Sequence, residues 1–294
     1  MGGAPAITVV IPTCARPELL PVSVAAVLGQ VTDVEFEVLV VNDDREPLRC
    51  LLPADPRLRV LTSGGRGVSA ARNLGIREAR APVVAFTDDD TVAPPGWLAA
   101  AHRGLAADPD AIGVEGPVEY GRSVDWLHEH VPEPEIPGGF CSCNVAYRRK
   151  PLLAVGGFDE RFPRPGGEDV DLGLRISELG PVRYEPDMVM IHPPRSASAR
   201  ELVRMARQVE NDWYVQSRHP GAVGARSRFG GIRWRTRRYL AFAGDREVTE
   251  GSPARVARAL VLGAGTAVVG LVTACSRPMP EERPPETRPP ETRP

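Results

Sequence analysis

The sequence has almost no lysine. Lys150 is the only lysine among 36 Lys and Arg residues, and 38 Asp and Glu residues leave a formal net charge of -2 at pH 7. Neither this balance nor the pI of about 6.3 favours a polyanionic partner, so the composition argues against a nucleic-acid-binding protein. We interpret the preference for arginine as compositional bias.

Cysteine is also scarce. The 5 cysteines include no two C-x-x-C pairs of the kind that structural zinc sites use, and their number is odd. For Cys141 and Cys143, packing is favoured over a soft-metal site because no second pair exists. The first residues, MGGAPAITVVIPT, lack the basic start and separate apolar core of a secretory signal. Together with the thiols, this predicts a protein of the reducing cytoplasm.

Long apolar runs are missing as well. The uncharged run Ala259–Cys275 has 17 residues with three glycines, which is borderline for a membrane span, so we expect a packed or surface-lying helix. Arginines interleave with aromatic residues over 226–239. That pattern suits peripheral contact with an anionic membrane, a phosphorylated acceptor, or a solvated basic helix. The proline-rich segment 276–294 is expected to be disordered.

Strand-type and helix-type segments alternate through the first 195 residues. Helices are expected over 17–30 and 68–80, and this alternation predicts an α/β fold with a doubly wound, mostly parallel sheet. A C-terminal helical and basic extension is expected over 196–275. The first four strands are expected at Ile7–Ile11, Phe36–Val41, Leu58–Leu61 and Val83–Thr87, and a later strand is expected at Phe140–Tyr147.

Three adjacent carboxylates, Asp88 to Asp90, end the fourth of these strands. Adjacent like charges raise one another's pKa, so such a cluster usually persists because a cation lies among them. A glycine-rich turn at 64–67 precedes a helix whose free N–H groups would favour phosphate. In an open parallel sheet both features face the carboxyl edge, where ligands bind. The sequence therefore predicts a divalent-metal site at this edge.

Six sequence blocks within Ile7–Pro194 resemble, in order, glycosyltransferase family 2 of the GT-A fold. They read VVIPTCARPELL, VLVVNDD, GRGVSAARNLGI, FTDDDTVAPPGWL, NVAYRRKPLLAVGGFDERF and GEDVDLGLRI. The resemblance implies a GT-A domain over 5–195, with a nucleotide-sugar-binding half over 5–110 and a smaller acceptor-binding half over 111–195. It also implies a metal-dependent, inverting enzyme that uses Mn2+ or Mg2+. The implied donor is a nucleotide-diphosphate sugar, in the first place a UDP-sugar, and the implied acceptor is a saccharide, lipid-linked glycan or small-molecule hydroxyl.

The resemblance also implies roles for individual residues. Asp88 and Asp90 match the outer acids of the D-x-D motif, which implies that Asp88 lies near the ribose and Asp90 binds the metal. Asp169 matches the catalytic base, although acids in a first helical turn also stabilise the helix dipole. His192 would complete the metal site or be structural. The residues implied at the nucleotide are Pro12, Thr13, Arg16, Asp43, Arg72, Asn73 and Asp88.

Two other functions compete with this interpretation. A nucleotidyltransferase shares the doubly wound sheet and the acidic metal site. It would carry a glycine-rich, basic phosphate loop after the first strand, where this chain has PTCAR. A non-catalytic nucleotide-sugar-binding scaffold would not need a base, so the joint presence of Asp88, Asp90 and Asp169 favours an enzyme.

Overall fold

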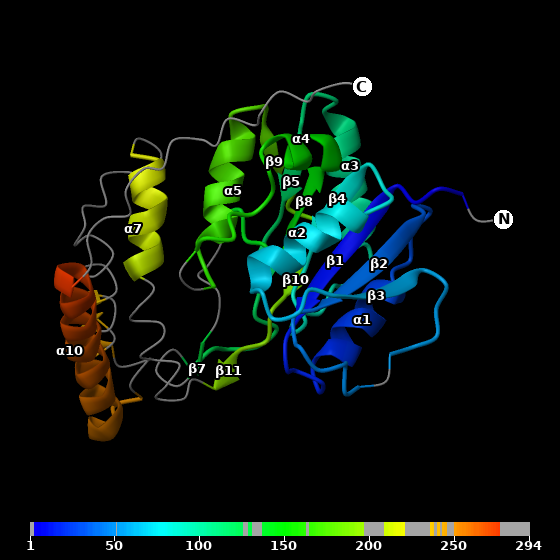
Figure 1. Ribbon diagram of the computed structural model, residues 1–294. Helices are drawn as coiled ribbons and strands as arrows, with labels where there is room; N and C mark the ends of the chain where they lie inside the picture. Colours follow the sequence, from blue (N-terminus) through cyan, green and yellow to red (C-terminus); the bar gives the residue numbers. More distant parts are fainter. Residues whose placement is uncertain are drawn as a thin grey trace.

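The computed structural model describes residues 3–50, 52–125, 129–130, 137–162, 165–196, 209–220 and 250–276, with short stretches at 236–237, 240–241 and 243–245. At its centre lies a seven-stranded sheet of order β3-β2-β1-β4-β8-β5-β9 (Figure 1). Its strands are β1 (Ile7–Thr13), β2 (Phe36–Asn42), β3 (Leu58–Thr62), β4 (Val83–Phe86), β5 (Gly113–Glu115), β8 (Val145–Arg148) and β9 (Val182–Tyr184).

The sheet is mostly parallel. β1 is parallel to both β2 and β4, β2 is parallel to β3, and β5 is parallel to β9. Only β8 is reversed, pairing antiparallel with β4 and β5. The chain builds outward from β1 to β3 and then returns to place β4 on the other side of β1. That reversal of strand order creates the crevice at which α/β sheets bind ligands.

Helices cover both faces of the sheet. Apolar residues of α1 (Leu20–Leu28) and α3 (Trp97–Ala107) share one core cluster with Val9 of β1. Val10, the next residue of β1, points to the opposite face and joins the cluster of α2 (Val68–Glu78), α4 (Arg149–Ala154) and α5 (Glu168–Ser177). Because both faces are covered, the continuous apolar runs of the central strands are buried throughout.

Helix α2 approaches β1 closely at Gly75. A Cβ atom at this position would lie 2.5 Å from Val10 Cγ1, so a larger residue would push the helix outward. Arg72 lies three residues earlier on the same helix, slightly less than one turn away. The close approach therefore fixes how deeply Arg72 sits against the end of the sheet.

Two element boundaries differ from the expectation. The first helix begins at Leu20 rather than Pro17, and Pro21 lies in its first turn, where a missing N–H costs no helical hydrogen bond. The strand expected over 140–147 begins only at Val145. Before it, Asn144 N donates to Cys141 O at 2.9 Å, so this segment is a turn.

The remaining elements lie beside the sheet. β6 (Val118–Glu119) pairs with β10 (Met190–Ile191), and β7 (Glu129–His130) pairs with β11 (Arg195–Ser196). Helix α7 (Val209–Arg218) contacts α5, and α10 (Pro253–Ser276) contacts α7 (Figure 1). Among the described helices, none has the length and hydropathy to cross a membrane. The tail beyond Ser276 and most of segment 226–239 lie outside the described residues.

Candidate active site

The candidate site lies at the carboxyl edge of β1 and β4, the edge that the sequence predicted. Thr13 ends β1, and Asp88–Asp90 follow β4. Asp89 is buried and accepts hydrogen bonds from Thr13 Oγ1 and from Arg16 Nη1, each at 2.7 Å. Burial raises the pKa of Asp89, and the charge of Arg16 opposes that shift. Asp89 therefore fixes the shape of the turn that carries the two outer aspartates.

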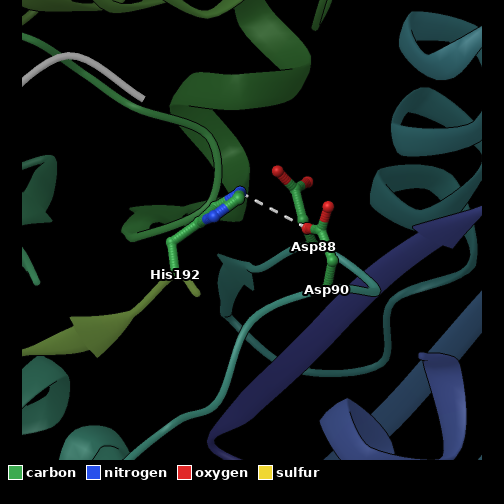
Figure 2. A group of neighbouring side chains, drawn as sticks. All are labelled: Asp88, Asp90 and His192. Atoms are coloured by element: carbon green, nitrogen blue, oxygen red, sulfur yellow. Dashed lines mark ion pairs between the residues drawn. The ribbon is translucent and has the colours of Figure 1, made fainter. Parts of the chain in front are cut away.

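Asp90 is buried among two arginines and a histidine. Its Oδ2 lies 3.0 Å from Arg16 Nη1 and 2.6 Å from Arg195 Nη1. Its Oδ1 lies 3.5 Å from His192 Nε2, and Figure 2 shows the imidazole pointing toward this carboxylate. Oδ1 is buried and has no hydrogen-bond partner among the described residues. An orphaned buried carboxylate oxygen is costly unless a cation or a donor meets it.

These side chains fit a divalent metal ion. One ligand atom each from Asp88, Asp90 and His192 lie within 4.8 Å of one another. Two carboxylates and an imidazole suit Mn2+, and the carboxylates also suit Mg2+. His192 was predicted to act either as a ligand or structurally, and its side chain is brought to the cluster. Asp88, which the family resemblance implied to lie near the ribose, also offers an oxygen to this cluster.

Arg72 connects the acidic turn to helix α5. Its Nη2 lies 2.9 Å from Asp88 Oδ1, its Nη1 lies 2.8 Å from Glu168 Oε1, and its guanidinium lies 5.3 Å from the Phe158 ring centroid. Burial alone would lower the pKa of Arg72. The carboxylates of Asp88 and Glu168 outweigh that effect and raise it above the usual value. Arg72 therefore remains charged and joins the two parts of the site.

Asp169, the expected base, lies half-buried beside Glu168 in the first turn of α5. Its Oδ2 accepts a hydrogen bond from Ser142 N at 3.2 Å, and its Oδ1 accepts one from Val170 N at 2.9 Å. Glu168 is buried. Burial raises the pKa of Glu168, the charge of Asp169 adds to this, and Arg72 opposes it. The half-buried Asp169 is thus the more accessible carboxylate of the pair.

Asp43 occupies the glycine-rich turn before α2, so two N–H groups of this turn, Arg66 N and Gly67 N, are not free for phosphate as expected. Asp43 accepts hydrogen bonds from Arg66 N and Gly67 N, both at 2.9 Å, and from Ser63 Oγ at 2.6 Å. A carboxylate at a helix N-terminus interacts favourably with the helix dipole, as a phosphate would. Asp43, expected near the nucleotide base, is therefore held at the end of β2 by three donors.

Asn73 and Pro12 differ in what they contact. Asn73 Nδ2 donates to Phe158 O and Asn73 Oδ1 accepts from Phe158 N, both at 2.8 Å, while Nδ2 also lies 3.0 Å from Glu160 Oε1. These contacts join α2 to the segment before α5. Pro12 is buried within β1 next to Thr13. For both residues, a contact with the nucleotide stays a prediction.

Two residues of the site were not predicted. Glu168 lies in the first turn of α5, where an acid stabilises the helix dipole, and its position next to Asp169 was the one available signal. Arg195 lies three residues after His192 and reaches Asp90 at 2.6 Å. No local pattern marks it, because the β10 and β11 region meets the acidic turn only in the folded chain.

The profile of the family described as "Glycosyl transferase family 2" matches residues 8–154, which is half of the chain. The chain belongs to glycosyl transferase family 2. The family expectation from the sequence is confirmed, and it favours sugar transfer over nucleotidyl transfer. The matched range contains the acidic turn and Arg72, whereas Asp169 and His192 lie beyond it.

Curated relatives include larger proteins. The chain is 29% identical over 222 residues to chondroitin synthase of Escherichia coli, covering 59% of this chain and 32% of that protein. It is 30% identical over 223 residues to validoxylamine A glucosyltransferase of Streptomyces hygroscopicus subsp. jinggangensis (strain 5008), covering 60% of this chain and 52% of that protein. This family 2 chain therefore spans about a third to a half of these relatives.

Solved structures confirm the GT-A fold. Mannosyltransferase PcManGT from Pyrobaculum calidifontis, in complex with GDP-Man and Mn2+, superposes with a TM-score of 0.55 at 18% identity, covering 93% of this chain and 75% of that chain. GalNAc-T7 with UDP, GalNAc and Mn2+ gives a TM-score of 0.52 at 16% identity, covering 79% and 54%. At such identities the likeness establishes the fold of this family 2 chain.

Proposed function

We propose that this chain is a metal-dependent glycosyltransferase that moves a sugar from a nucleotide-diphosphate donor to an acceptor hydroxyl with inversion at the anomeric carbon. The observation that carries the proposal is the double contact of Arg72, with Asp88 at 2.9 Å and with Glu168 at 2.8 Å. Through this one side chain, the candidate metal ligands and the neighbour of Asp169 are held in the same region. Transfer from a diphosphate donor needs both groups close together.

The residues Asp88, Asp90 and His192 would hold Mn2+ or Mg2+, whose positive charge offsets the charge that develops on the departing diphosphate. The orphaned Oδ1 of Asp90 supports this assignment. Arg16 would keep the turn in place, because it lies 2.7 Å from Asp89 and 3.0 Å from Asp90. Arg195 adds a second guanidinium beside Asp90 and offsets acidic charge at this site.

Asp169 would act as the base. Its carboxylate would take the proton of the acceptor hydroxyl as that oxygen bonds to the anomeric carbon, and the diphosphate would leave from the opposite face. A single displacement of this kind inverts the anomeric configuration. The hydrogen bonds from Ser142 N and Val170 N orient the carboxylate for the transfer.

The nucleotide would bind between the ends of β1 and β2, and UDP is our first candidate. Residues 5–110 would form this nucleotide-sugar half, and residues 111–195 would form the acceptor half around α5. The residues that we assign to the nucleotide are Pro12, Thr13, Arg16, Asp43, Arg72, Asn73 and Asp88. Mannosyltransferase PcManGT was solved with GDP-Man, so GDP is the alternative nucleotide.

The protein would work in the cytoplasm with peripheral contact to an anionic membrane. The thiol side chains of Cys14, Cys50, Cys141 and Cys143, none of them in a disulfide, fit a reducing compartment. Helix α10 exposes a row of large apolar side chains on one side, and Arg255 and Arg258 lie near its start. Exposed apolar area beside arginines suits the surface of an anionic bilayer. The row consists of Leu260, Val261, Val268, Leu271 and Val272.

Calorimetric titration with UDP, GDP and dTDP, with and without Mn2+, tests the proposal. One nucleotide should bind only with Mn2+, and Asp90→Ala should abolish that binding. Asp187→Ala is the matched control, because Asp187 is 75% exposed and pairs only weakly with the exposed Arg103 at 3.3 Å. Binding that ignores both the metal and Asp90 would support a non-catalytic scaffold instead.

A further inference from the structure

Cys141 and Cys143 flank Ser142, whose N–H holds Asp169. The two sulfur atoms lie 3.3 Å apart, and neither cysteine is in a disulfide. The hydrogen bond from Asn144 N to Cys141 O, 2.9 Å, closes a tight turn around them. Cys143 is 1% exposed, whereas Cys141 is only half-buried.

This geometry suits an internal disulfide. Residues two apart can be separated by at most about 7 Å, which is the upper limit for bridged Cα atoms. A disulfide bond is about 2.05 Å long, so the sulfur atoms need to approach by roughly 1.2 Å. Redox-sensing thiols are commonly an accessible cysteine next to a resolving one. Cys141 and Cys143 differ in exposure in that way.

We propose that Cys141 and Cys143 form a reversible disulfide, and that closing it breaks the hydrogen bond from Ser142 N to Asp169. The first part is independent of the proposed function, whereas its effect on turnover rests on that function. The oxidant is a small-molecule disulfide such as glutathione disulfide. The Cys141 thiolate attacks one glutathione sulfur, releasing one glutathione thiolate, and Cys143 then attacks Cys141 Sγ and releases the second. Two protein thiols are oxidised, one disulfide is reduced, and the two protons pass to the released thiolates.

Both ends of the turn are held by hydrogen bonds, so only its middle residue, Ser142, is able to move. At one end, Phe140 N donates to the buried Glu115 Oε2 at 2.7 Å. At the other, Asn144 accepts a hydrogen bond from Trp97 Nε1 at 2.7 Å, and Asn144 Nδ2 donates to backbone carbonyl oxygens of Pro117 and Met188. The displacement caused by bond closure therefore falls on Ser142.

Intact-mass spectrometry of the full chain, equilibrated with graded ratios of reduced to oxidised glutathione and then alkylated, tests the disulfide. The wild type and the control Cys50→Ser should lose two hydrogen atoms and two alkylatable thiols, and peptide mapping should place the bond between residues 141 and 143. Cys143→Ser should instead keep a glutathione adduct at Cys141. Only adducts in the wild type, or a bond to another cysteine, would overturn the proposal.

Hydrogen exchange at the Ser142 amide tests the second part without any activity measurement. The oxidised wild type should exchange this amide faster than the reduced form, while Cys50→Ser behaves like the wild type. Turnover should fall by about tenfold or more on oxidation and return with dithiothreitol, because a displaced base loses much of its catalytic contribution. An unchanged Ser142 exchange rate in a chain that carries the disulfide contradicts the coupling. If the proposed function is wrong, both redox states lack turnover, yet mass and exchange still decide the inference.

Discussion

The guanidinium of Arg72 and the carboxylate of Glu168 form a buried ion pair, with 2.8 Å between Nη1 and Oε1. Each side chain is 4% exposed, and the pair joins α2 to the first residue of α5. Because Arg72 also contacts Asp88, the acidic turn and the helix that carries Asp169 are held by one guanidinium. The shape of the candidate site depends on this contact.

Removing one partner of the pair should destabilise the protein strongly. Glu168→Ala leaves the Arg72 charge with fewer buried partners, and breaking buried ion pairs in this way typically costs about 3–5 kcal/mol. Denaturant unfolding should show a free energy of unfolding lower by about that amount. Asp187→Ala removes an exposed pair and should change the same quantity by less than about 0.5 kcal/mol. Equal effects of the two variants would mean that the Arg72–Glu168 pair is not energetically important.

Loss of the imidazole should weaken metal binding. His192→Ala should raise the Kd for Mn2+, followed by electron paramagnetic resonance, by at least about tenfold, the lower end of what is seen for residues that only orient metal ligands. His102→Ala provides the control, because His102 is an exposed residue of α3. An unaltered Mn2+ affinity in His192→Ala would mean that this histidine is structural.

Removal of the proposed base should separate catalysis from binding. Asp169→Asn should lower kcat by about 10²–10⁴-fold, the usual contribution of general acid–base catalysis. Affinity for the nucleotide with Mn2+, measured by calorimetry, should stay unchanged, because Asp169 is assigned to the acceptor. Asp187→Asn should leave both quantities at wild-type values. Wild-type turnover in Asp169→Asn would show that another group takes the proton.

Lowering the pH should weaken the contacts between Asp159 and helix α7. Asp159 Oδ2 accepts hydrogen bonds from Tyr214 Oη at 2.8 Å and Arg218 Nη1 at 3.0 Å. Burial would raise the pKa of Asp159, but hydrogen bonds from Arg161 and Tyr214 outweigh this and lower it to about 2 from 3.8. A lowered pKa stabilises the fold above about pH 4, and this contribution is lost as the pH falls from about 4 to about 2.

The variant Asp159→Asn tests this pH dependence. At neutral pH its Tm should lie below that of the wild type, and the difference should shrink as the pH falls through that window. Asp187→Asn should show no such convergence, since its partner is exposed. A Tm difference between wild type and Asp159→Asn that stays constant down to pH 2 would mean that the charge of Asp159 does not stabilise the fold.

Polar substitutions on α10 should reduce membrane contact. Val261 and Val268 are 69% and 61% exposed, and replacing both with Asp removes apolar area and adds negative charge. Co-flotation with vesicles of anionic phospholipid should decrease, and binding of the wild type should fall as salt rises. Val31→Asp is the control, because Val31 is 79% exposed but lies outside α10. Absence of the wild-type protein from the floated fraction would remove the membrane proposal.

The sheet and the acidic turn were predictable because their signals are local. The run Ile7–Ile11 specifies a strand buried on both faces by its own composition. Asp88–Asp90 begin two residues after Phe86, the last residue of β4, so the position of that strand also fixed the position of the carboxylates. The start of α1 at Leu20 and the turn at Cys141 were less predictable, since packing rather than periodicity decides such boundaries.

The sequence by itself determined the parallel sheet and the acidic turn Asp88–Asp90 at its carboxyl edge, because each follows from its immediate neighbours in the chain, whereas the role of Asp169 was proposed from the family resemblance. Only the tertiary structure decided that Asp43 fills the glycine-rich turn, that Glu168 pairs with Arg72, and that Arg195 reaches Asp90. The partners of these last two pairs come from segments about 100 residues apart. The contact between these partners depends on how helices and loops pack against the sheet. That packing cannot be inferred from the residues near each partner in the sequence.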